Sequence, residues 1–229
     1  MTRHPPHRPV GRPLPLLSLC LLTCAGCLLL AGCSVFGIAA QALPEGDVPA
    51  RYKDLRGHSV AVMVWTPRGL QIDYPALRLD VASQVQDKLQ RAQKAGKGEL
   101  KGVAFPHIPA SVVRFQEDHP ELEGQPIDQV APRLRVERLI YVEIDSFQTR
   151  AQNAIELFRG SVTGSLKVVD VDPGGTARVV YDEPGITVQY PSKGADEGYP
   201  DLGDERTYRG TVHLFTNLLA RRFFAHERT

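Results

Sequence analysis

The sequence has no cysteine after residue 33. All four of its cysteines, Cys20, Cys24, Cys27 and Cys33, lie near the beginning of the chain. The 196 residues from 34 to 229 therefore form no disulfide and must be held by an ordinary apolar core. That length is sufficient for one full-sized domain.

The sequence also lacks a marked excess of charge of either sign. It has 27 Lys and Arg residues against 26 Asp and Glu residues. Three basic residues and no acidic residue precede Cys33, which leaves 24 basic against 26 acidic residues after it. Such a near-neutral chain lacks the electrostatic footprint of a nucleic-acid-binding protein, so we expect no nucleic-acid partner.

Common catalytic and nucleotide-binding motifs are missing. Neither a Gly-x-Gly-x-x-Gly pattern nor a Walker loop occurs, and Ser161, Ser165 and Ser192 lack the Gly-x-Ser-x-Gly context of a nucleophile elbow. Gly160 and Gly164 fall in a strand pattern, where close backbone packing or a bulge explains them better than phosphate binding. We therefore expect no cofactor.

The first 33 residues have the three parts of an export signal. Arg3, Arg8 and Arg12 form a positive front without acidic residues, and an apolar stretch runs from residue 14 to residue 32. It ends in the sequence Leu-Leu-Leu-Ala-Gly-Cys, in which the small residues Ala31 and Gly32 precede Cys33.

The last four of these residues resemble the lipobox of bacterial lipoproteins. The resemblance implies that the Cys33 thiol is alkylated with diacylglycerol, that a peptidase cuts before it, and that the new amino terminus is acylated. It divides the chain into a signal peptide (1–32), a lipidated N-terminus and tether (33–57) and a periplasmic domain (58–229). Ser34, in place of an aspartate, implies sorting to the outer membrane under the rule familiar from enteric bacteria.

Two alternatives concern this leader. An uncleaved transmembrane anchor is one, because the nineteen residues from 14 to 32, of which only Pro15, Ser18 and Thr23 are clearly less apolar, would span roughly 28 Å as a helix. Such an anchor needs neither small residues nor a cysteine at its end, so we favour the lipoprotein signal. Cys24 and Cys27 form a CxxC pattern, but within an apolar export helix they are interpreted as small apolar residues rather than as a redox or metal pair.

The first half of the domain predicts a strand–helix–strand arrangement. Residues 59–65 form a continuous apolar run that predicts a central strand covered on both faces, and residues 66–69 break it. Apolar residues spaced by three or four predict a helix over 76–95. A short strand at 103–105, a helix from Pro109 to about Gln116, a helix over 127–134 distorted by Pro132, and a second strong strand at 139–144 follow.

The second half predicts an antiparallel meander and a terminal helix. Strands are expected at 161–172, 177–181 and 186–190, with a turn at 173–176. An amphipathic helix then carries an apolar stripe from Tyr208 to Phe223. The fold class is α/β (α+β), with a single mixed sheet and helices packed on it.

This order of elements, over residues 59–190, resembles that of periplasmic lipoproteins with the fold of the TolB amino-terminal domain. The group includes the penicillin-binding-protein activator LpoB and the curli secretion lipoprotein CsgG. The resemblance implies a non-enzymatic protein that binds other envelope proteins or assembles with them. No long membrane-crossing hairpins of a pore-forming kind occur in the sequence.

A few polar clusters are candidates for chemistry. Glu117, Asp118 and His119, with His107 nearby, offer metal ligands or an acid–base pair, but we interpret them as a solvated helix end. Acidic residues also gather in the loop before the terminal helix, where their spacing differs from that of an EF-hand; they are Asp196, Glu197, Asp201, Asp204 and Glu205. His58 and His213 show no partner pattern, and Trp65, Tyr141 and the terminal phenylalanines are interpreted as core.

These features favour a lipid-anchored, non-enzymatic adaptor, assembly factor or accessory subunit of the cell envelope. Its expected partners are the membrane, through lipidated Cys33, and other envelope proteins. A small-ligand-binding module is the alternative, and it requires a closed pocket of several hundred cubic ångströms. An enzyme ranks third, since it requires titratable side chains that converge in a cleft. We expect no catalytic, cofactor or metal site.

Overall fold

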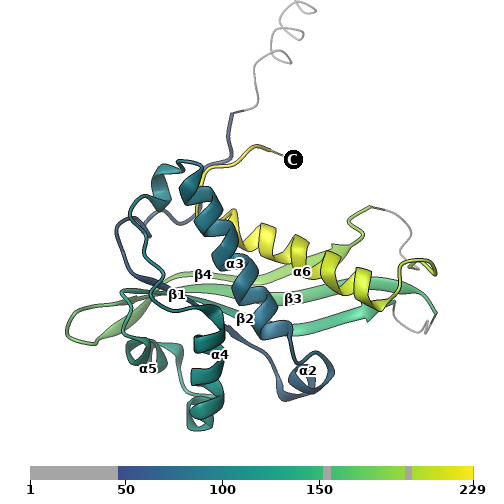
Figure 1. Ribbon diagram of the computed structural model, residues 1–229, viewed down its shortest axis with the longest axis horizontal. Coiled ribbons are helices and arrows are strands. Elements are labelled where there is room, and N and C mark those ends of the chain that lie inside the picture. Colours follow the sequence, from purple (N-terminus) through teal and green to yellow (C-terminus); the bar gives the residue numbers. More distant parts are fainter. Residues whose placement is uncertain (1–45, 152–155, 194–197, 229) are drawn as a thin grey trace, which may run out of the picture. The chain divides into compact units, whose positions relative to one another are not determined.

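The structure, a computed structural model, describes residues 46–151, 156–193 and 198–228. Four strands form one mixed sheet in the order β1-β2-β3-β4 (Figure 1). They are β1 (Val60–Trp65), β2 (Arg138–Arg150), β3 (Phe158–Val171) and β4 (Ala177–Tyr190). β1 and β2 pair in parallel, and the other two pairs are antiparallel. This confirms the predicted α+β class with a single mixed sheet and an antiparallel second half.

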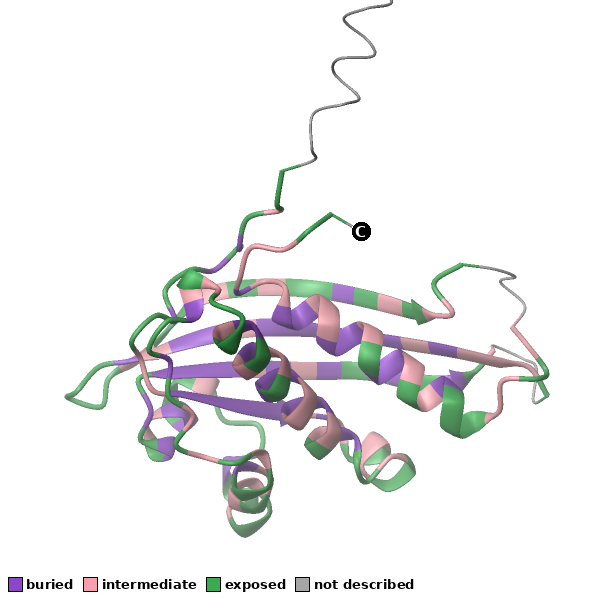
Figure 2. Cartoon of the chain, turned by 45° about the horizontal axis from the view of Figure 1, so that its top comes forward, coloured by how far each residue is buried: buried purple, intermediate pink, exposed green. Residues whose placement is uncertain are grey.

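Helices cover one face of the sheet and part of the other. α3 (Leu77–Lys94) and α6 (Asp204–Ala220) pack on the first face, with their buried sides turned toward the strands (Figure 2). α4 (Pro109–Asp118), α5 (Ile127–Val130) and the 3₁₀ turn η3 (Ala131–Leu134) cover the second face near β1 and β2. Two short 3₁₀ turns, Gly98–Leu100 and Pro120–Leu122, complete this part of the fold.

The prediction of β1 as a central strand is wrong, because β1 lies at an edge of the sheet. Its residues are nevertheless buried on both sides. Val60, Val62 and Val64 belong to the cluster shared with α3 and α6, whereas Ala61 and Met63 belong to the cluster shared with α4 and α5. The strand is buried on both faces because helices pack above and below it, not because it has neighbouring strands on both sides.

Three other elements differ from those expected. The break after β1 contains a short helix, α2 (Arg68–Asp73), which begins directly after Pro67. The expected strands 177–181 and 186–190 form one strand, since β4 passes Pro184 and Gly185 with a shift in its register against β3. Residues 103–105 form no strand of their own but a single bridge between Ala104 and Ser59.

The free edge of β4 is irregular. Its register against β3 shifts twice, and Pro184 lacks a backbone donor. Bulges and edge prolines are features that protect a strand from pairing with another chain. The edge of β4 is therefore poorly suited to adding a strand.

The segment before β1 contributes to the core. Ala50, Tyr52 and Leu55 are all buried, and the backbone of Arg51 and Tyr52 donates hydrogen bonds to the carbonyl of Arg222. Within the described residues, no helix combines the length and apolar character needed to cross a bilayer.

Candidate functional site: a basic groove between α3 and α6

The polar residues around α4 do not converge. Glu117 pairs with Arg78 at 3.3 Å, and Asp118 lies 3.9 Å from Arg114. His119 bonds through Nδ1 to the Phe115 carbonyl at 2.9 Å.

His107 is engaged elsewhere: its Nε2 lies 2.7 Å from the carbonyl of Leu134. Across the described ranges, no group of three His, Cys, Asp or Glu residues is arranged to hold a metal ion.

The other sequence candidates are also accounted for individually. Asp204 binds Arg150 and Thr149 at the start of α6, Glu205 pairs with Arg209 one turn later, and Asp196 and Glu197 lie outside the described residues. The predicted lipidation site, Cys33, also lies outside them.

The two strand glycines serve packing. A Cβ added at Gly160 would lie 1.7 Å from the Thr211 hydroxyl, and one added at Gly164 would lie 2.2 Å from the Glu143 carbonyl oxygen. Ser161 and Ser165 occupy positions on β3 that pair with Gln148 and Glu143 on β2. These findings confirm the packing interpretation of Gly160 and Gly164.

The large buried aromatics belong to the core. Phe215 and Phe223 are each 1 % exposed and pack with the residues of α3. Tyr141 packs against the second cluster, and burial raises its pKa.

Arg138 is the most deeply buried charged residue, at 7 % exposure. Its guanidinium donates to Asp54, Asp170, His58 Nε2 and the Glu137 carbonyl. Because all five of its donors are used, this cluster ties the segment before β1 to the sheet rather than offering a free cation.

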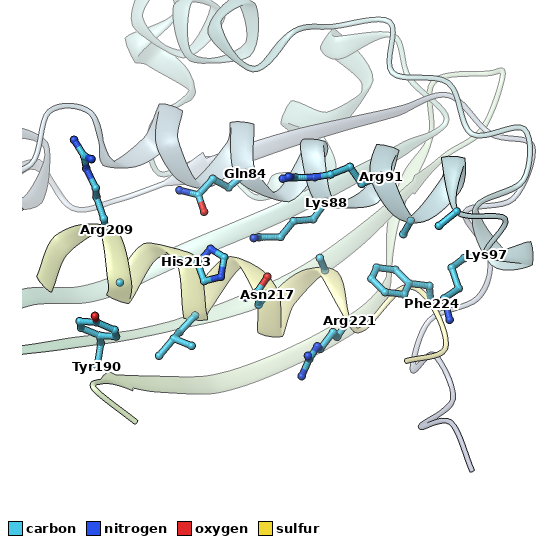
Figure 3. Close-up of a pocket in the computed structure, with 15 residues that line it drawn as sticks. Gln84, Lys88, Arg91, Lys97, Tyr190, Arg209, His213, Asn217, Arg221 and Phe224 are labelled. Atoms are coloured by element: carbon cyan, nitrogen blue, oxygen red, sulfur yellow. The ribbon is translucent and has the colours of Figure 1, made fainter. Parts of the chain in front are cut away.

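An open groove of about 1010 Å³ lies between α3 and α6 (Figure 3). Five Lys or Arg residues and one histidine are among its lining residues, and no Asp or Glu is. These six residues are Lys88, Arg91, Lys97, Arg209, His213 and Arg221. In a chain with nearly equal numbers of acids and bases, this segregation makes the lining of the groove positive, although Glu205 and Asp47 pair with Arg209 and Lys97 from outside it.

Lys88, Arg91 and His213 lie close together in the groove. Lys88 extends from α3 toward His213 and Asn217 on α6 (Figure 3). Burial, followed by the charge of Arg91, lowers the pKa of Lys88 even though Asp87 acts in the opposite direction. Burial, Lys88 and Arg91 together lower the pKa of His213. Among the described residues, no ion pair joins Lys88 or Arg91 to a carboxylate, and the charge of the neighbouring Asp87 offsets only part of the repulsion that Arg91 exerts on Lys88.

Side-chain contacts hold the two helices beside each other. The Tyr208 hydroxyl donates to Asp80 at 2.7 Å, and the Thr216 hydroxyl lies 3.0 Å from Oε1 of Gln84. Burial and the bond to Asp80 raise the pKa of Tyr208, so this hydroxyl stays a donor. These contacts fix the walls before any ligand is bound.

A glycine shapes one end of the groove. A Cβ at Gly210 on α6 would meet the ring of Tyr190 at 2.4 Å, so only glycine lets the ring lie against the helix. Lys97 and Phe224 line the other end (Figure 3). Lys97 also lies 3.9 Å from Asp47, at the point where the described fold begins.

The apolar stripe of the terminal helix predicts a buried face but not this groove. A second row on the same helix carries Arg209, His213, Asn217 and Arg221, each four residues apart. Such a row lies along one face of a helix. The row was visible in the sequence, but its pairing with Lys88 and Arg91 on α3 required the fold.

A second cavity lies at the end of β1. It has a volume of about 160 Å³ and is lined by residues that include Met63, Trp65, Phe115, Gln116 and His119. This volume is below the several hundred cubic ångströms that the small-ligand alternative requires.

Comparisons with known proteins give no family and no curated relative: neither the family models nor the curated proteins contain a match. Solved structures with a similar arrangement exist. The PelC dodecamer of Paraburkholderia phytofirmans is 13% identical over 79% of this chain and 94% of its own, with a TM-score of 0.41. The hypothetical protein CT253 of Chlamydia trachomatis is 16% identical over 73% and 93%, with a TM-score of 0.40.

Lipoprotein GNA1162 of Neisseria meningitidis is also similar, at 12% identity over 57% of this chain and 81% of its own, with a TM-score of 0.34. The neighbours thus include a bacterial lipoprotein. At these identities and TM-scores the likeness assigns no function, and the function must be argued from the residues of this chain.

Proposed function

We propose that this protein is a lipid-anchored accessory protein of the bacterial cell envelope that acts by binding another envelope protein and not by catalysis. The lipobox at Cys33 supports the anchor, and the groove between α3 and α6 supports the binding role. The observation on which the proposal rests is the pair of cations Lys88 and Arg91, which lie beside His213 in an open groove with no carboxylate among its lining residues.

The form of the groove favours a binding surface. Its walls are helix faces whose contacts are already made, and its cations are spread along it rather than directed at one point. A catalytic site instead needs an acid or base and a nucleophile within hydrogen-bond reach of each other. The irregular edge of β4 makes pairing by strand addition the less suitable mode of contact.

Affinity purification from solubilised envelopes tests this function. The full chain carrying Lys88→Glu and Arg91→Glu is compared with the wild type and with Lys94→Glu, which places the same charge change on an exposed residue of α3 that does not line the groove. We expect at least one envelope protein to be recovered with the wild type and with Lys94→Glu but to be lost with the double variant. Equal recovery with all three proteins would contradict the proposal.

A further inference from the structure

The groove has the dimensions of a site for an elongated ligand. On the α6 side, Arg209, His213, Asn217 and Arg221 follow one another at every fourth position. With a rise of 1.5 Å per residue, this row extends over about 18 Å. A single small anion would contact only a fraction of it.

The groove also has apolar lining residues. Ala92, Leu214, Ala220 and Phe224 line it together with the cations. An occupant that matches the whole groove therefore needs an apolar stripe flanked by negative charges. A purely polar polyanion would leave this apolar surface unmatched.

The position of Lys88 argues against a flat occupant. It is half-buried between the walls and points across the groove toward α6 (Figure 3). A flat bilayer surface would touch the rims of a concave groove, whereas a convex cylinder about 10 Å in diameter can lie along it, over both helices. Arg91 is exposed and can pair with a charge on the flank of such a cylinder, and His213 is exposed and can form a hydrogen bond with it.

The other conformations of a peptide fit less well. An extended segment gains its affinity from the backbone of a sheet edge, but both walls of the groove are helices whose backbone groups are paired internally. The described helices of a second copy do not supply the occupant either. Most of the large apolar residues of α3, α4 and α6 are buried in the cores of their own chain, and Leu79 on α3, which is 37% exposed, stands alone rather than in a stripe.

We propose that the groove receives an amphipathic helix from a partner protein, with an apolar stripe at helical spacing and Asp or Glu residues along both sides of the stripe. This inference rests on the proposed binding function and names the chemistry of the partner. The helix would place its stripe on Leu214 and Phe224, and its carboxylates would pair with Lys88 and Arg91 and accept a hydrogen bond from His213. Spacing of apolar anchors at i, i+3, i+4 and i+7 is the usual form of helix-in-groove recognition.

Fluorescence anisotropy with synthetic peptides tests the inference. The full chain is purified in a non-ionic detergent and titrated into a labelled 16-residue peptide that has leucines at helical spacing and glutamates on both flanks. A scrambled peptide of equal composition and a peptide with lysine in place of glutamate are the controls. We expect the acidic amphipathic peptide to bind at least tenfold more tightly than either control, and more weakly as salt increases.

Groove variants locate the binding. Lys88→Glu with Arg91→Glu on α3 should weaken it at least tenfold, and Lys94→Glu should change it less than twofold. Because Lys88 is half-buried, its substitution could disturb the fold, so a second variant on the opposite wall, Arg209→Glu with His213→Gln, provides an independent test. Near-UV circular dichroism checks that every variant is folded. Equal binding of the scrambled peptide, or binding that neither groove variant weakens, would overturn the inference.

A vesicle-binding assay distinguishes binding of an acidic helix from binding of an anionic membrane surface. Groove-dependent binding to vesicles that contain phosphatidylglycerol, without binding of the acidic peptide, would overturn the helix inference in favour of a lipid surface. The proposed function fails by a different result, the loss of any groove-dependent partner in the envelope purification. If that partner persists while all helical peptides fail, only the helix inference falls.

Discussion

At the scale of single residues, close contacts explain glycines that the sequence presents without context. Gly160 lets α6 approach β3, and Gly210 lets the ring of Tyr190 lie on α6. The strand pattern was enough to suggest that Gly160 is needed for packing. It could not name Thr211 as the neighbour, because the two residues are brought together only by the fold.

Gly160→Ala should destabilise the protein. The added Cβ would lie 1.7 Å from the Thr211 hydroxyl oxygen and 3.0 Å from its Cβ, so α6 would have to move away from the sheet. Overpacking of this kind costs about 1–3 kcal/mol of the free energy of unfolding. Urea denaturation measures the loss. Gly69→Ala, in α2 with no atom within 4 Å of the added Cβ, is the control and should not be destabilising.

The pKa of His213 should respond to its cationic neighbours. Burial lowers this pKa, and the charges of Lys88 and Arg91 lower it further. Lys88→Met should therefore raise it, as measured by NMR titration of the imidazole protons. Because the pKa of His213 is lower in the folded than in the unfolded chain, the free energy of unfolding decreases as the pH falls from the unfolded-state pKa to the folded-state pKa. Lys88→Met should make this decrease smaller. An unchanged pKa would show that Lys88 and His213 do not interact.

At the scale of elements, the strong hydrophobic patterns predict which segments are buried strands and helices. They do not predict which elements lie next to each strand in the sheet. The apolar run of β1 predicted a strand buried on both faces, but not that one of its sides is an edge. The Pro184-Gly185 pair suggested a break between two strands, yet an edge strand tolerates it as an irregularity in register. Periodicity identifies which face is buried, whereas the neighbours of that face depend on tertiary structure.

Glu183 holds the segment after α6 against β4. Its carboxylate accepts hydrogen bonds from Arg51 at 2.7 Å and from Arg222 at 2.9 Å. Burial alone would raise the pKa of Glu183, but hydrogen bonds from Tyr181 and Arg222, with the charges of Arg222 and Arg51, outweigh it and lower this pKa.

Glu183→Gln should lower the free energy of unfolding at neutral pH by about 2 kcal/mol, since it leaves Arg222 without its charged partner. A carboxyl group with a lowered folded-state pKa contributes stability above its unfolded pKa, and this contribution is lost as the pH falls through the folded pKa. The difference between wild type and variant should therefore shrink in acid. Urea denaturation at neutral and acidic pH measures it. Glu205→Gln, which breaks an exposed pair with Arg209, should cost less than about 1 kcal/mol.

At the scale of the whole molecule, the proposed anchor and groove are connected by a short segment. Fourteen residues lead from Cys33 to Asp47, and fully extended they span at most about 50 Å. Since Asp47 lies beside Lys97 at one end of the groove, a partner would be held near the lipid surface. The anchor is a prediction from local sequence alone, whereas the groove is formed by helices more than 100 residues apart in sequence.

Cys33→Ala should release the protein from the membrane fraction, because the acyl chains supply the anchor. Fractionation of envelopes, with immunodetection of the precursor and the processed form, measures the release. Ser34→Ala changes the neighbouring residue without removing the thiol and should leave the protein membrane-bound. Continued membrane association of Cys33→Ala with an uncut leader would instead indicate a transmembrane anchor.

Photocrosslinking in living cells tests the central claim most directly. A photoreactive amino acid replaces Asn217 in the groove or, as a control, Asp128, an exposed residue of α5 on the opposite face of the sheet. We predict a discrete adduct with an envelope protein from position 217 that disappears when Lys88→Glu and Arg91→Glu are added, and no such adduct from position 128. The absence of an adduct at 217, or one that survives the charge reversal, would contradict the account.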